Sequence, residues 1–284
     1  MNSFGQEFYP YESIRALKFA DRTRMTDRRA LIEHIASQLS QTSEMTRLRV
    51  AAKIVQRFLL GNATTIVPPP QSQAFARLVA RNRHTPTQIE LLYLRLANVD
   101  SIVGRMAREL FYPVCVAGRP PDSYASAEFA AANGAQLFTP VPMLTRNFIH
   151  AHAEEKWHFK NKATIDRSLR VLQNAGLIAR ERMPGLRGHP PALTMSTHDV
   201  SLVTFVWALH EEFLPHMGDA HFALMPESIA ISDFARTLLL SPEQIAAHCL
   251  AARKHQLLAQ QNKQLRFVFG NLEALADALL NKAI

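Results

Sequence analysis

Two groups of side chains in this sequence have the types that could bind a metal ion. In the first, His150, Glu154 and His158 follow one another at intervals of four residues, with His152 and Glu155 beside them. In a helix this spacing puts ligands on one face, as a metal site would need. The span is two turns, however, or about 12 Å, which is too long for all three to hold one ion. No HExxH pattern occurs, and we predict no metal site here.

The second group follows the most apolar segment of the chain, residues 202–209, which we expect to be a buried connecting helix. It comprises His210, Glu211, Glu212, His216, Asp219 and His221. Such a set could form a hydrolytic metal site, but an exposed helix end followed by a loop explains it more simply.

The common catalytic motifs are missing from the sequence. There is no GxxxxGK[ST] loop, no GxGxxG after a strand and no GxSxG elbow. Cys115 and Cys249 lie far apart in apolar surroundings, which is typical of core cysteines and argues against a disulfide scaffold or a thiolate zinc site. We therefore predict no catalytic residue, no cofactor and no enzymatic activity.

Basic residues are concentrated in one part of the chain. The net charge is +8, and residues 156–190 carry eight Lys and Arg residues against two acids, Asp166 and Glu181. That segment therefore supplies +6 of the total, and a local positive field of this kind is what binding to a polyanion requires. With few cysteines, no signal-peptide pattern and no long apolar run, we expect a cytoplasmic protein without a membrane segment.

Helical patterns dominate, so we expect a mainly α fold. The expected helices are 26–41, 44–60, 71–81, 86–97, 99–111, 124–132, 143–157, a segment starting near Thr164, 231–240, a segment starting at Ser241, and 272–282. Pro113 should end the helix before it. Gln88 should form a capping box with Thr85. Strand patterns pair residues 177–183 with 192–195, and residues 257–260 with 265–269.

Residues 163–197 combine an amphipathic helix with a hairpin. Ile165, Leu169 and Leu172 form the apolar stripe expected to face the core. Gly176 suits a left-handed helix cap, after which Leu177 begins a strand. A loop rich in Pro and Gly leads to the second strand.

This segment resembles the recognition helix and wing of winged-helix transcription regulators, over about 50 residues. The resemblance implies a helix in the DNA major groove and a wing along the backbone. The residues expected to contact DNA are Lys160, Asn161, Lys162, Thr164, Arg167, Ser168, Arg170, Arg180, Arg182 and Arg187. A winged helix that binds proteins is the alternative.

Residues 227–284 repeat the same order of elements with fewer basic residues. Ser241, Pro242 and Gln244 form a helix start with a capping box, and Ile245 and Cys249 should face inward. This second unit could pack on the first, mediate contacts or touch DNA. The order of elements also resembles the BrxA-type accessory proteins of bacterial BREX phage-defence systems, on the segments Leu91–Pro113, Thr164–Arg180 and Ile245–Phe269.

The expected architecture is therefore an N-terminal helical bundle followed by two winged-helix units. Its parts are helical regions at 1–66 and 71–136, a basic winged helix at 137–200, a connecting helix at 201–226 and a second winged helix at 227–284. The expected function is binding of double-stranded DNA, as a transcription regulator or as an accessory factor of a DNA-processing or phage-defence system. The alternative is a scaffold subunit that binds other proteins of such a complex.

Overall fold

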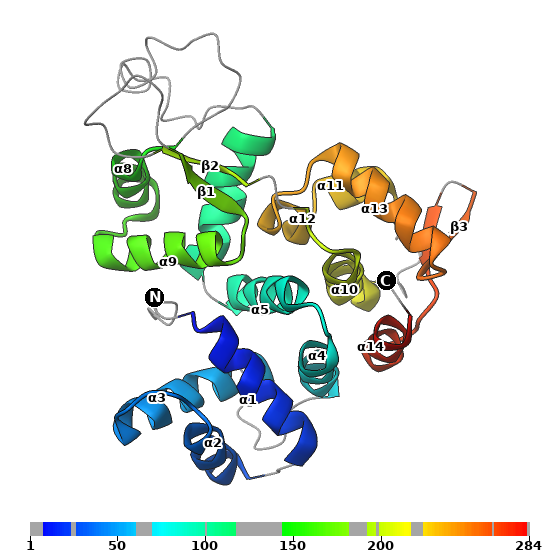
Figure 1. Cartoon of the computed structure of the whole chain (residues 1–284). Helices are drawn as coiled ribbons and strands as arrows, with labels where there is room; N and C mark the ends of the chain where they lie inside the picture. Colours follow the sequence, from blue (N-terminus) through cyan, green and yellow to red (C-terminus); the bar gives the residue numbers. More distant parts are fainter. Residues whose placement is uncertain are drawn as a thin grey trace.

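The computed structural model describes residues 8–23, 27–60, 70–99, 101–117, 144–181, 192–196, 199–216, 224–262 and 264–282. Within these ranges the protein is mainly helical, with two small two-stranded sheets, which confirms the expected mainly α fold (Figure 1). The expected helix at 124–132 lies outside the described residues. None of the described helices combines the length and apolar character needed to cross a membrane.

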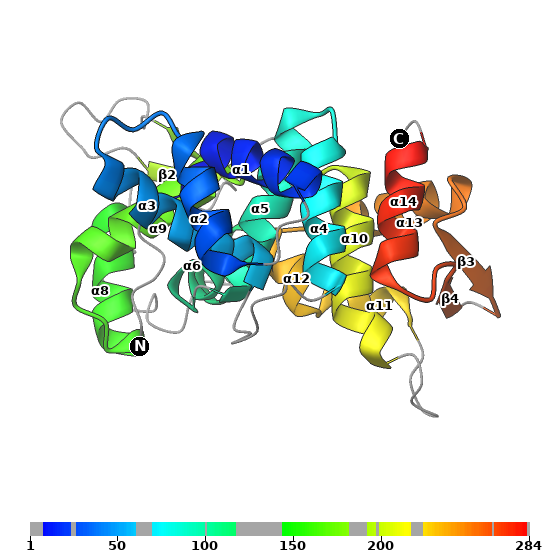
Figure 2. The same cartoon turned by 90° about the horizontal axis from the view of Figure 1, so that it is seen from below.

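The N-terminal half is built from helices. They are α1 (Pro10–Thr23), α2 (Arg28–Ser37), α3 (Glu44–Ile54), η1 (Val55–Leu60), α4 (Pro70–Arg81), α5 (Thr85–Val99), α6 (Ser101–Arg105) and η2 (Met106–Val116). The stripe of Leu31, Ile35 and Leu39 is buried as its spacing predicts. Helix α1 packs against α4, and α2 packs against α3 (Figure 2).

Two local predictions in this half are wrong, for reasons of tertiary packing. The helix expected to end before Pro113 continues to Val116 as the π-helix η2, in which Ala117 N donates to Tyr112 O at 3.0 Å. Burial of Leu110 and Val114 on either side of the proline favours this continuation. Gln88 does not cap its own helix: its buried Nε2 donates to Val79 O and Asn82 O, at 2.6 and 2.8 Å, and so satisfies the end of α4.

Two parts of the chain share one order of elements. The first, called here the first helix–hairpin unit, consists of α6 and η2, a bridge residue Leu144, α8 (Arg146–Trp157), α9 (Lys162–Asn174), β1 (Ile178–Glu181) and β2 (Ala192–Met195). Strands β1 and β2 are antiparallel, with Ile178 opposite Met195. Leu144 exchanges both backbone hydrogen bonds with Leu193 and so adds a third, one-residue strand to the hairpin.

The second helix–hairpin unit repeats this order closely. It consists of α10 (Leu202–Phe213) with η4 (Leu214–His216), the bridge residue Leu224, α11 (Pro226–Ala230), α12 (Asp233–Thr237), α13 (Pro242–Lys254), β3 (Leu258–Gln261) and β4 (Gln264–Phe267), and α14 (Leu272–Asn281) follows. Leu224 pairs with Leu265 as Leu144 pairs with Leu193. The capping box of Ser241 and Gln244 forms as predicted.

The helix expected at residues 231–240 is shorter in the structure: only α12, Asp233–Thr237, forms within that range, and α11 ends before it at Ala230. The Ser232 side chain accepts a hydrogen bond from Ala235 N and so starts α12. The expected connecting helix is α10, which is buried along its length and packs against α5, α13 and α14. Its contacts join it to the second unit, where it occupies the place that α6 and η2 occupy in the first.

Helix α5 lies between the two units and ties them together (Figure 1). The buried Tyr93 donates from its hydroxyl to Thr237 O at 2.9 Å, and Arg108 donates to Thr237 Oγ1 at 3.1 Å. Helices α5 and α6 approach so closely that a Cβ on Gly104 would lie 2.5 Å from Ala97 O. The two units therefore share one continuous core with α5.

The turn from helix to hairpin is the same in both units. Gly176 has φ 76°, and Gln256 at the equivalent position has φ 54°. Leu177 N donates to Leu172 O, and Leu257 N donates to Ala252 O, as in a Schellman cap. The left-handed cap predicted at Gly176 is confirmed.

These two turns give a matched stability prediction. We expect Gly176→Ala to lower the free energy of unfolding by about 1–2 kcal/mol, because a Cβ is unfavourable in the left-handed region. Gln256→Gly should raise it by less than about 1 kcal/mol, since strain relief is offset by the greater backbone entropy of glycine when unfolded. Urea unfolding of both variants measures the effects. Equal signs for the two substitutions would contradict the equivalence of the turns.

Candidate functional site

The connection between α8 and α9 is short and held at both ends. His158 takes a left-handed conformation, φ 52°, and stops α8. Trp157, one residue earlier, is buried: its Nε1 donates to Glu109 Oε2 at 2.8 Å, and the Arg105 guanidinium lies 5.1 Å from its ring centre. Asn161 then caps α9 by accepting from Thr164 N at 3.1 Å. The turn 158–161 is therefore anchored at both ends, by the buried Trp157 on one side and the Asn161 cap on the other.

The inner face of α9 is wider than the sequence pattern indicated. Ile165, Leu169 and Leu172 are buried as predicted. Thr164 and Ser168 are also buried, at 2% and 0% exposed, against the packing of α9 on α5, α6 and η2. Ser168 Oγ donates to Thr164 O within the helix. The expectation that these two residues face DNA is therefore corrected: both face the core.

The other described candidates lie toward solvent. Arg167 is half-buried, and the remaining ones are exposed: Lys160, Asn161, Lys162, Arg170 and Arg180. The side chain of Lys160 is 81% exposed, and its Nζ lies 3.8 Å from Glu154 Oε1. The hairpin residues Arg182 and Arg187 lie outside the described residues. We call Lys160, Asn161, Lys162, Arg167, Arg170 and Arg180 the α9 surface.

An acidic residue within this region, Asp166, is held by α8. Arg146 donates to both carboxylate oxygens, and His150 Nε2 lies 2.9 Å from Oδ1. Burial alone would raise the pKa of Asp166, but the hydrogen bonds from Arg146 and His150 outweigh it and lower the pKa. The carboxylate stays ionised and its charge is balanced by α8, so it offsets little of the positive charge of the α9 surface. Nothing in the sequence signalled this pairing, because the partners are 20 residues apart.

The equivalent helix of the second unit presents a different surface. Its inward residues Ile245 and Cys249 are buried as predicted. Its exposed residues include Ala246, Ala247 and Leu250, the last 64% exposed, with charges only toward the two ends. The exposed face of α13 is therefore apolar at its centre, whereas the exposed face of α9 carries basic residues.

Two of the histidines that suggested metal binding, His152 and His210, are buried, so His210 does not lie at the exposed helix end that was expected. His152 packs between the rings of Phe148 and Trp157. His210 is fully buried, with its Nδ1 2.8 Å from Val206 O, and burial lowers its pKa to about 4. Among the described residues, no three His, Cys, Asp or Glu side chains are grouped so as to hold a metal ion. Asp219 and His221 lie outside those residues.

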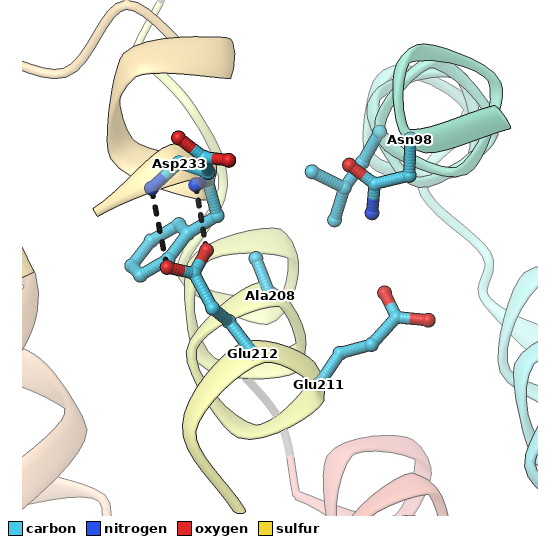
Figure 3. Close-up of a pocket in the computed structure, with 7 residues that line it drawn as sticks. Asn98, Ala208, Glu211, Glu212 and Asp233 are labelled. Carbon is cyan, nitrogen blue, oxygen red and sulfur yellow. Dashed lines mark hydrogen bonds between the residues drawn. The ribbon is translucent and has the colours of Figure 1, made fainter. Parts of the chain in front are cut away.

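A pocket of about 280 Å³ lies where α5, α10 and α12 meet (Figure 3). Glu212 accepts from the backbone N–H groups of Asp233 and Phe234, at 3.1 and 2.8 Å, and so caps α12. Glu211 forms an ion pair with Arg95, in which Arg95 Nη1 lies 2.5 Å from Glu211 Oε1. Both glutamates therefore bond to other parts of the fold. We interpret the pocket as a gap where three helices meet and not as a catalytic site.

No known protein family matches this chain, and neither a curated protein nor a solved structure was found to be similar to it. The resemblances to winged-helix regulators and to BrxA-type proteins therefore stay predictions.

Proposed function

We propose that the protein binds double-stranded DNA through the first helix–hairpin unit, acting as a winged helix. The order of helix, bridge strand, two helices and hairpin supports this proposal, because it matches the order expected of a winged helix, in which the last helix enters the major groove. Helix α9 holds that position. Its inner face packs on α5, α6 and η2, and its outer face carries Lys162, Arg167 and Arg170 of the α9 surface.

The observation that carries the proposal is the charge of the α9 surface. Lys160 and Lys162 flank the N-terminus of α9, and Arg170 lies on the exposed face two turns further on. A helix N-terminus already attracts phosphates through its free N–H groups and its dipole, and the two lysines add to that attraction. Arg180 extends the same charge onto β1. A duplex laid along α9 would therefore meet cations at the turn, the helix and the hairpin.

The proposal predicts salt-dependent binding to a duplex of mixed sequence. Each phosphate contact contributes about 0.9 to the slope of log affinity against log salt, so Lys162→Ala with Arg170→Ala should reduce the slope by about 2. Affinity at moderate salt should fall by roughly tenfold or more, because two phosphate contacts are lost. Fluorescence anisotropy with a labelled duplex, across a salt series, measures both quantities.

The matched control removes the same two charges elsewhere. Arg28 on α2 and Arg83 between α4 and α5 are exposed and lie on other elements. Alanine at both positions should leave the slope within about 0.5 of the wild-type value, because neither contacts the duplex. An equal loss in the two double variants would mean that the overall charge drives binding, and would remove α9 as the site.

The second helix–hairpin unit supports the alternative, a scaffold that binds proteins. Its helix α13 has an apolar outer centre with Leu250 exposed, which suits contact with a protein better than contact with phosphates. The two functions are compatible, since they use different helices. Absence of salt-dependent duplex binding would favour the scaffold function over DNA binding.

A further inference from the structure

Helix α13 carries a stripe of exposed residues with a definite order of charge. The stripe consists of Glu243, Ala246, Ala247, Leu250, Arg253 and Lys254. These positions follow one another at three- and four-residue intervals, so they form a single face over three turns. The acid lies at the N-terminal end, the apolar residues in the middle and the two bases at the C-terminal end. The opposite face packs on α10 and α11.

We propose that this α13 stripe is a contact between two copies of this chain, packed antiparallel about a two-fold axis. In such a pair, residue i of one copy faces residue j of the other, and j faces i in return. The occupant is therefore a second copy of the same stripe. This inference goes beyond DNA binding and does not depend on it.

One register satisfies the apolar and the charged residues together. When Leu250 of one copy lies over Ala246 and Ala247 of the second copy, the small alanines leave room for the leucine, as knobs fit holes in paired helices. At this same register, Glu243 lies level with Arg253 and Lys254 of the second copy. Both ends of the pair then join opposite charges, and the helix dipoles are antiparallel.

Other arrangements of the stripe are less favourable. A parallel pair would place Glu243 against Glu243 and the basic ends against each other, which is repulsive. The equivalent surface of the first unit lacks this order of charges, because Lys162 and Arg170 give it a basic residue toward each end. Helix α13 lies on the side of α10 away from α5 (Figure 1), and its stripe residues are exposed within the part of the chain that the structure describes.

Sedimentation equilibrium of the full chain without DNA tests the proposal. We expect a reversible shift from 31.9 kDa toward twice that mass. The dissociation constant should be micromolar, since a helix pair buries less than the roughly 1,600 Å² of a standard interface. Leu250→Lys should leave a monomer at 100 µM, a concentration roughly tenfold or more above the wild-type constant. A wild-type chain that is monomeric at that concentration overturns the proposal in favour of a different protein on α13.

A charge exchange tests the antiparallel register itself. Glu243→Lys alone should weaken association at least about tenfold, because it faces Arg253 and Lys254 of the second copy. Adding Arg253→Glu and Lys254→Glu should restore the wild-type constant, since all the charges are then reversed together. Failure of the triple variant to dimerise, when its circular dichroism and melting match the single variant, overturns the register. All these variants retain Lys162 and Arg170, so loss of duplex binding would be a separate result.

Discussion

Reversing the charge at Lys162 and Arg170 is expected to weaken duplex binding by about 10³-fold at moderate salt. In the proposed binding mode, each reversal would remove a cation from a phosphate and put a like charge in its place, so the effect should exceed that of alanine. Both side chains are exposed, so the free energy of unfolding should change little. Anisotropy titrations of Lys162→Glu with Arg170→Glu, beside thermal melts, measure the two quantities.

The control for this prediction comes from α9 itself. Ser168 lies between these residues in sequence but is fully buried, so Ser168→Ala should alter stability and leave duplex affinity at the wild-type value. The Arg28→Glu and Arg83→Glu double variant carries the same charge change on other elements. Wild-type affinity in the Lys162 and Arg170 variant would show that α9 does not face the duplex.

The free energy of unfolding is expected to fall by about 3 kcal/mol as the pH is lowered from 6.5 to 4, because of His210. Burial lowers the pKa of this side chain to about 4, from 6.5 in an unfolded chain. A group whose pKa is lowered by folding makes its full contribution to stability at pH values above its unfolded pKa. This contribution is lost as the pH falls toward the folded pKa, because the unfolded state then binds the proton more strongly than the folded state. His210 packs 4.0 Å from the ring centre of Phe267, so protonation would place a charge in the core.

The measurement is the difference between wild type and His210→Phe in urea unfolding at pH 4 to 7. Burial also lowers the pKa of His152 and His248, so the wild-type curve contains more than one histidine. The Phe variant should retain their contribution and lose the part due to His210. Parallel curves for the two proteins would contradict the assignment to His210.

Much of the local structure could be predicted from the sequence. The helix at 71–81 and the start of α13 have strong signals, an amphipathic period in one and a capping box in the other, and both form as expected. The left-handed cap at Gly176 was also predictable, because this backbone conformation at a helix end favours glycine. These features depend on neighbours within a few positions of the chain, which a sequence displays directly.

Other features depended on contacts between distant residues. Pro113 lies inside η2, where burial of the surrounding helix outweighs its usual tendency to end one. Gln88 bonds to α4 and not to its own helix, because the carbonyls at the end of α4 need a donor there. The pairing of Asp166 with Arg146 and His150 likewise joins two helices.

For the candidate site, the sequence by itself determined the concentration of positive charge in residues 156–190 and the amphipathic character of α9. Only the tertiary structure decided which polar residues of that helix face outward. Because α9 packs on α5 and α6 as well as on its own hairpin, its buried face is wide enough to take in Thr164 and Ser168. A helical period indicates where a buried stripe is centred, whereas its width is set by how many elements pack against the helix.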